Sequence, residues 1–124
     1  MGRSLWQDGE SGVMNLTTET VDGKTVLRLG EPRLDAHNSG ELKDFMLRLL
    51  EGGGRHLIVD LSPVSFIDSS GLGALLSGQK NAALRSGAFM LAGLQPRVHA
   101  MFELTRLHRV FEIYSTVEEA LRGE

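Results

Sequence analysis

The stretch from His56 to Leu76 constrains the fold more than any other part of the chain. It reads HLIVDLSPVSFIDSSGLGALL, so an apolar run leads, after a short break, into Asp68, Ser69 and Ser70 and then into a helical pattern. A short, continuous apolar run is typical of a strand that is covered on both faces. The sequence therefore predicts a buried strand whose connection delivers an Asp-Ser-Ser cluster to the first turn of a helix.

The rest of the chain alternates strands and helices. Two strand-like runs, 13–20 and 24–29, flank Asp22-Gly23, a pair that favours a tight hairpin because both turn positions require positive φ. The capping-box pattern Asn38-Ser39-Gly40-Glu41 and the apolar stripe after it predict a helix that stops at 52–54. The later elements are expected to be a strand at 56–61, a helix to about 86, a strand at 88–91, a helix from Pro96, a strand at 110–114 and, after a second capping box, a helix from Thr116.

This order, β-β-α-β-α-β-α-β-α, indicates an α/β fold. The solidly apolar strands alternate with helices, which argues for parallel strands covered by helices, and the hairpin adds an antiparallel edge. We therefore expect a mixed five-stranded sheet with four helices, formed by one domain at 13–124. Residues 1–12 are polar and glycine-rich and are expected to form a flexible tail.

Helical periodicity also predicts which side chains are buried. In the helix after the serine cluster, the inner face is expected to consist of Leu72, Leu75, Leu76, Gln79 and Ala83. In the helix from Pro96, it is expected to consist of Val98, Met101, Phe102 and Thr105.

Composition excludes several classes of protein. The chain has 124 residues, a net charge of −3 and no basic stripe that would bind nucleic acid. It has no cysteine for disulfides or thiolate metal sites, and no apolar run long enough to cross a bilayer. The N-terminus lacks the apolar segment of a secretory signal, so we expect the protein in the cytoplasm, away from membranes.

The cluster Asp68-Ser69-Ser70-Gly71 allows two interpretations. In the simpler one, Asp68 or Ser69 caps the helix, which stabilises it by about 1 kcal/mol. A cap needs one side-chain oxygen, so a hydroxyl is left over near the helix N-terminus, where backbone N–H groups and the helix dipole tolerate a phosphate. In the other interpretation this hydroxyl is a switch, and the spacing alone does not decide between the two.

A stripe of small residues runs along the same helix. Gly71, Ala74, Gly78 and Ala82 follow at helical spacing. Close packing on the sheet is the simpler explanation, and a flat groove for a partner helix is the alternative. Because a glycine in mid-helix costs about 1 kcal/mol relative to alanine, Gly78 should have a packing reason.

Other chemistry finds little support. The glycines at 52–54 lack the Gly-Lys-Ser/Thr ending of a phosphate-binding loop, and Ser70 lacks the Gly-x-Ser-x-Gly frame of a hydrolase. The four histidines do not have metal-ligand spacing. The sequence therefore predicts no metal, no cofactor and no catalytic residue.

The octet Phe66-Ile67-Asp68-Ser69-Ser70-Gly71-Leu72-Gly73 resembles the signature of bacterial anti-sigma factor antagonists, which belong to the STAS domain family. The resemblance extends over about residues 14–122. The other matching positions are 25–30 and 34–36, then 91–94, 98, 104, 105, 107, 110 and 111, and finally 119–121. It implies a STAS fold and a regulatory binding protein that is not an enzyme.

The resemblance also implies site residues. In that family the second serine of the motif, here Ser70, is phosphorylated by the anti-sigma factor, which is itself a serine kinase. Asp35 matches an aspartate that is important for contact with the kinase, and Asp68 and Ser69 match residues that shape the phosphorylation loop. Together with Gly71, these residues are predicted to bind the partner.

The implied function is that of an anti-sigma factor antagonist. The unphosphorylated protein would bind the anti-sigma factor and release the sigma factor; phosphorylation would end the binding, and a serine phosphatase would restore it. A phosphate adds about −1.5 to −2 charge, which a surface that buries a neutral hydroxyl would then have to bury. We expect the switch to change the surface and not the fold, with ATP and Mg²⁺ belonging to the kinase.

Two other functions stay open. The chain could be a STAS module of a sensory complex or of a lipid-transport system that uses the same face without phosphorylation, because the fold alone does not choose. A small hydrolase that uses Ser70 is the third hypothesis, and it has the least support because no histidine lies in a recognisable base motif.

The sequence departs from the family pattern in one loop. The loop from Gly30 to Asp35 is longer by a residue or two than the usual spacing in the STAS domain family.

Overall fold

The computed structural model describes residues 14–123, so the predicted flexible tail at 1–12 lies outside the described residues. The elements are β1 (Leu16–Val21), β2 (Lys24–Leu29), β3 (Arg33–Leu34), α1 (Ser39–Glu51), β4 (His56–Asp60), β5 (Phe66–Ile67), α2 (Ser69–Leu84), β6 (Ala88–Ala92), α3 (Pro96–Leu104), the 3-10 helix η2 (Leu107–Arg109), β7 (Glu112–Tyr114) and α4 (Val117–Arg122).

Five of the strands form one mixed sheet in the order β1-β2-β4-β6-β7. β1 and β2 pair antiparallel around Asp22 and Gly23, whose φ angles of +51° and +80° are the positive values that a two-residue hairpin requires. The other neighbours pair in parallel. Together with α1 to α4, this sheet confirms the predicted α/β fold.

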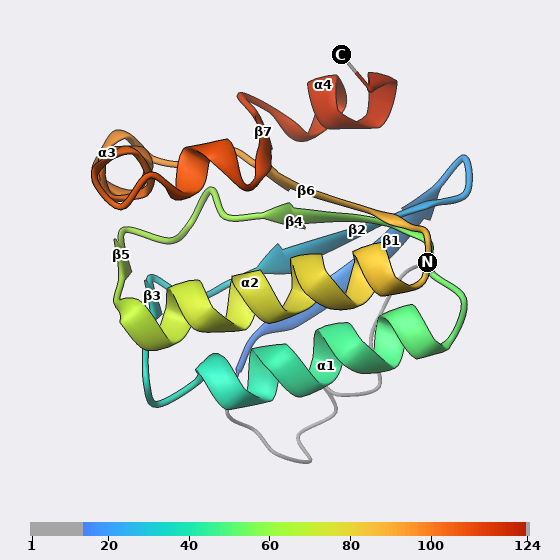
Figure 1. Ribbon diagram of the computed structural model, residues 1–124, viewed down its shortest axis with the longest axis horizontal. Helices are drawn as coiled ribbons and strands as arrows, with labels where there is room; N and C mark the ends of the chain where they lie inside the picture. The colour runs from blue at the N-terminus through green and yellow to red at the C-terminus, as the bar shows by residue number, and fades with distance from the viewer. Residues whose placement is uncertain (1–13, 124) are drawn as a thin grey trace.

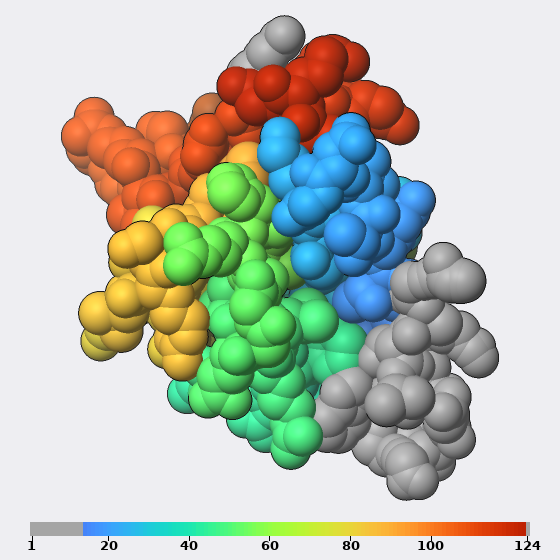
Figure 2. All heavy atoms as spheres, turned by 90° about the vertical axis from the view of Figure 1, so that its right-hand side faces the viewer, coloured from blue at the N-terminus to red at the C-terminus, as the bar shows by residue number. Residues whose placement is uncertain are grey.

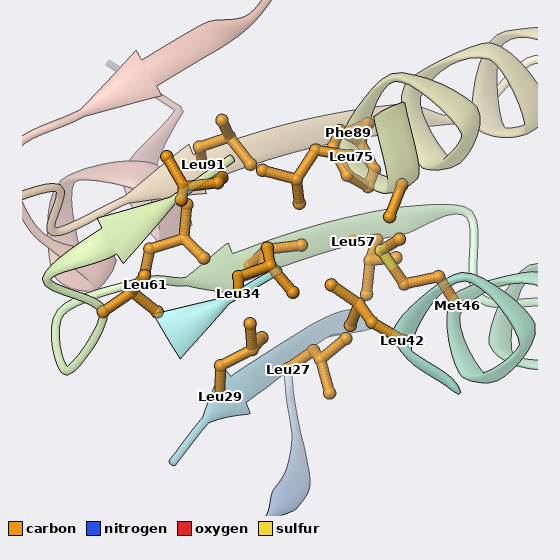
Figure 3. Close-up of a cluster of buried hydrophobic side chains, with 14 of the residues drawn as sticks. Leu27, Leu29, Leu34, Leu42, Met46, Leu57, Leu61, Leu75, Phe89 and Leu91 are labelled. Atoms are coloured by element: carbon orange, nitrogen blue, oxygen red, sulfur yellow. The ribbon is translucent and has the colours of Figure 1, made fainter. Parts of the chain in front are cut away.

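Helices cover both faces of this sheet, with α1 and α2 on one side and α4 on the other (Figure 1). Because side chains alternate along a strand, Val59 of β4 packs toward α1 and α2, while its neighbour Ile58 packs with Ala120 of α4. The hairpin of β1 and β2 lies between α4 and α1 at one end of the molecule (Figure 2). In the larger core, Leu34 of β3 points in among leucines from β2, β4 and α1 (Figure 3).

The buried face of α2 differs from the expected one. Leu72 and Leu75 are buried, but Leu76 and Gln79 are only partly buried and Ala83 is exposed. The other buried residues of this helix are the small ones, Gly71, Ala74, Gly78 and Ala82. A Cβ on Gly78 would lie 2.7 Å from Cε1 of Phe89, so the small residues let α2 approach the sheet closely, as the packing interpretation predicts.

The chain between α3 and β7 is also less regular than expected. Thr105 is exposed and follows the last residue of α3, so its predicted place on the inner face is wrong. The backbone N–H groups of Val110 and Phe111 donate to the carbonyl oxygen of Leu107, at 2.9 and 3.2 Å. These bonds hold a tight turn, and β7 consequently begins at Glu112 instead of Val110.

Candidate functional site

A second, two-stranded sheet brings together the loops that carry the candidate site. β3 and β5 pair in parallel, with Leu34 opposite Ile67, and the N–H of Asp68 donates to the carbonyl oxygen of Leu34 at 3.2 Å. This sheet was not predictable from the sequence, because two-residue strands have no recognisable periodicity. It lies beside the N-terminal ends of α1 and α2 (Figure 1).

Asp68 is the cap of α2. Its backbone is extended, its Oδ1 accepts a hydrogen bond from the N–H of Gly71 at 2.9 Å, and its Oδ2 accepts one from the N–H of Ala36 at 3.2 Å. One carboxylate therefore both caps the helix and ties the helix to the loop after β3. Of the two capping candidates in the sequence, the structure selects Asp68 and leaves Ser69 uninvolved.

Ser69 and Ser70 are the first two residues of α2, and both are exposed. Within residues 14–123, neither hydroxyl takes part in a hydrogen bond. The condition that the switch hypothesis requires, an accessible hydroxyl at the helix start that the fold does not use, is therefore met at Ser70.

Asp35 organises the loop that faces α2. Its Oδ1 accepts from the backbone N–H of His37 at 3.0 Å, and its Oδ2 lies 3.3 Å from Nε of Arg33. The hydrogen bond from His37 lowers the pKa of the Asp35 carboxyl, and Arg33 lowers it further, while desolvation of the side chain, which is 14% exposed, opposes both. Asp35 is therefore held as a carboxylate inside its own loop.

The predicted capping box at Asn38 does not form. The Oδ1 of Asn38 accepts from the N–H of Asp35 at 2.9 Å, and its Nδ2 donates to the carbonyl oxygen of Arg33 at 2.9 Å. The side chain is therefore used by the loop, and α1 starts at Ser39 without a side-chain cap. The second predicted capping residue is confirmed, because Thr116 accepts from the N–H of Glu119 at 3.1 Å.

Gly71 is buried beneath the two serines. A Cβ at this position would lie 2.5 Å from the carbonyl oxygen of Leu34 and 2.8 Å from Cγ1 of Ile67. The glycine is therefore required for the seating of α2 on the small sheet. Gly71 belongs to the stripe of small residues for which close packing is the simpler explanation, and its contacts agree with that explanation. Its predicted part in partner binding stays a prediction.

A groove runs between the starts of α1 and α2. It is lined by Ser39, Gly40, Lys43, Ser70, Gly73 and Ala74. The sequence pattern does not indicate a role for Lys43, since a lone lysine on an amphipathic helix carries no signal of its own. Only the packing of α1 beside α2 places it in the same groove as Ser70.

Other kinds of site find no counterpart in the described part of the chain. Between residues 14 and 123, no group of three or more histidines, aspartates and glutamates is placed to hold a metal ion. The helices of this region are all too short or too polar to cross a membrane.

Comparison with known proteins assigns the family. The sequence profile of the STAS domain matches residues 15–120. The anti-sigma-B factor antagonist of Listeria monocytogenes is 31% identical over 114 residues, which cover 89% of this chain and 97% of the relative. The chain belongs to the STAS domain family of anti-sigma factor antagonists.

Solved structures agree with the STAS fold. An anti-sigma factor antagonist from Mycobacterium paratuberculosis superimposes with a TM-score of 0.79 at 24% identity, covering 89% of this chain and 92% of that one. The Bacillus cell fate determinant SpoIIAA in its phosphorylated form gives a TM-score of 0.67 at 24% identity, covering 87% and 97%. Anti-sigma factor antagonists are regulators of sigma factors and not enzymes, in agreement with the prediction from the sequence.

Proposed function

We propose that this STAS domain, when unphosphorylated, binds an anti-sigma factor that is also a serine kinase and thereby releases the sigma factor. Phosphorylation of Ser70 ends the binding, and a serine phosphatase restores it. The observation that carries this proposal is the exposed hydroxyl of Ser70 in the first turn of α2, which no hydrogen bond occupies among the described residues. The cytoplasm, where kinase and sigma factor meet, is the proposed compartment.

The geometry supports a switch that leaves the fold intact. Asp68 satisfies the cap of α2 with Oδ1, so a phosphate on Ser70 displaces no existing bond. The added negative charge lies at the positive end of the helix dipole, which tolerates it. The charge becomes unfavourable only when a partner covers the site, because burying an uncompensated charge costs free energy.

The proposed partner-binding residues divide into two groups. Ser69 and Ser70 are exposed and would touch the partner directly. Asp35, Asp68 and Gly71 would act mainly by positioning, since both carboxylates are engaged by loop donors and the glycine is buried. The exposed surface that they shape consists of the start of α2 and the loop at 35–38.

The relatives support the same assignment. The Listeria monocytogenes protein is named an anti-sigma-B factor antagonist, and SpoIIAA, which shares the fold, has been solved both without and with phosphorylation. Transfer of that chemistry to this chain rests on the matching Asp68-Ser69-Ser70-Gly71 cluster and on its exposure.

Phosphorylation with the cognate kinase tests the proposal. The full chain is incubated with ATP and with a candidate anti-sigma factor that has serine-kinase activity, and the modified residue is mapped by mass spectrometry. We expect one phosphate, on Ser70, and none on a Ser70→Ala variant. Phosphate on another serine while Ser70 stays unmodified would overturn the site, and co-purification with a membrane transporter instead of a soluble kinase would overturn the function.

A further inference from the structure

Lys43 of α1 and Ser70 of α2 line the same groove. The two residues are 27 positions apart in the sequence, and the packing of the two helices brings them together. Lys43 is exposed, and in the part of the chain that the structure describes it takes part in no ion pair. Among the described residues that line the groove, it is also the only charged one.

The other charged groups near the start of α2 are already engaged. Both oxygens of Asp68 accept backbone N–H groups, and Asp35 is bonded within its loop. Nε of Arg33 lies 3.3 Å from Oδ2 of Asp35. The guanidinium carbon of Arg33 lies over the ring of Phe66, 4.2 Å from the ring centre. Nδ1 of His37 lies 3.6 Å from Oδ1 of Asp35. Of these cations, Lys43 is the one that lines the groove with Ser70 and has no ion-pair partner among the described residues.

We propose that Lys43 binds the phosphate on Ser70 across the groove between α1 and α2. The inference rests on the proposed phosphorylation of Ser70 and adds the residue that holds the modified side chain. Gly40 and Gly73 leave the groove without bulky side chains, so a phosphate has room there. A lysine ammonium acts as a compact positive charge for such an anion.

This ion pair gives phosphorylation a second effect on the surface. In the unmodified protein the ammonium group of Lys43 is free to meet an acidic group of a partner. Once the phosphate is present, the lysine is engaged within the molecule. The groove then offers a partner a negative charge, a filled space and no free cation.

The test uses the full chain with phosphoserine placed at position 70 during translation, so that no kinase is needed. The pH midpoint of the second ionisation of the phosphate is followed by ³¹P NMR. Because a cation stabilises the dianion, we expect a midpoint about half a pH unit lower in the otherwise unchanged protein than in a Lys43→Gln variant. A Lys43→Arg variant, which keeps the charge, should keep most of the shift.

Lys80→Gln is the matched control. Lys80 is exposed on the same helix as Ser70 but ten residues further on, about 15 Å away along the axis. Its replacement should leave the midpoint unchanged. Equal midpoints for the Lys43→Gln variant and the unchanged protein, or equal shifts for Lys43→Gln and Lys80→Gln, would overturn the proposal. Modification of another serine by the kinase would overturn the proposed function without affecting this measurement.

Discussion

The carbonyl oxygen of Leu34 would lie 2.5 Å from a Cβ atom on Gly71. The same oxygen accepts a hydrogen bond from the N–H of Asp68, so Leu34 of β3 contacts the start of α2 at both Asp68 and Gly71. No side chain fits between the helix and this small sheet. The position at which Ser70 is displayed is therefore set by backbone contacts and not by the serine itself.

Gly71→Ala should destabilise the fold. The new methyl group meets backbone that is held in a parallel pair, and overpacking of this kind costs about 1–3 kcal/mol of unfolding free energy. Gly73→Ala, two residues on, is the control: a Cβ there meets nothing within 4 Å, and alanine should stabilise the helix by up to about 1 kcal/mol. Urea unfolding of both variants checks the prediction, and a change of the same sign in both would contradict it.

The sequence predicted the elements that have strong periodicity or a specific turn residue. β2 has the expected bounds, Asp22-Gly23 forms the hairpin, and Pro96 opens α3. For the small residues of α2, the sequence left close packing and a partner groove open, and the contact between Gly78 and Phe89 supports close packing.

What could not be predicted depends on contacts between distant segments. Asn38 has the sequence pattern of a helix cap, but its amide is used by Asp35 and Arg33, partners that only the folded loop provides. The pairing of β3 with β5 involves two residues a strand, too few for a pattern. Lys43 enters the site for the same kind of reason, through the packing of α1 against α2.

Asp68→Ala should loosen the start of α2 and the loop after β3 together. The variant loses the cap, which costs about 0.5–2 kcal/mol, and also the bond to the N–H of Ala36. Hydrogen exchange should become faster at Gly71 and at Ala36. Thr116→Ala, which removes the cap of α4, is the matched control and should leave both amides unchanged. If the Ala36 amide exchanged no faster in Asp68→Ala, Asp68 would not be the residue that links the loop after β3 to α2.

The stabilisation that Asp35 contributes to the fold should decrease as the pH falls. The N–H of His37 and the guanidinium of Arg33 hold the pKa of Asp35 below its ordinary value, which the unfolded chain restores. The ionised carboxylate therefore stabilises the fold above the ordinary aspartate value, and this contribution is lost as the pH falls through the lowered value of the folded protein. Urea midpoints of the unchanged protein and of Asp35→Asn should differ at neutral pH and converge in acid. A difference that stays constant over the whole pH range would contradict this origin of the stabilisation.

Ser70→Glu should separate binding from stability. A carboxylate in the first turn interacts favourably with the helix dipole, so the variant should unfold no more easily than the unchanged protein. Binding of the anti-sigma factor should nevertheless weaken at least about tenfold, because the partner must bury the new charge. Calorimetric titration of Ser70→Glu measures the effect. Ser70→Ala keeps the site neutral, and Thr20→Glu adds the same charge on the hairpin at the opposite end of the sheet (Figure 1). Both controls should bind like the unchanged protein, and an equal loss in Thr20→Glu would show that the net charge of the molecule, and not the charge at this site, controls the interaction.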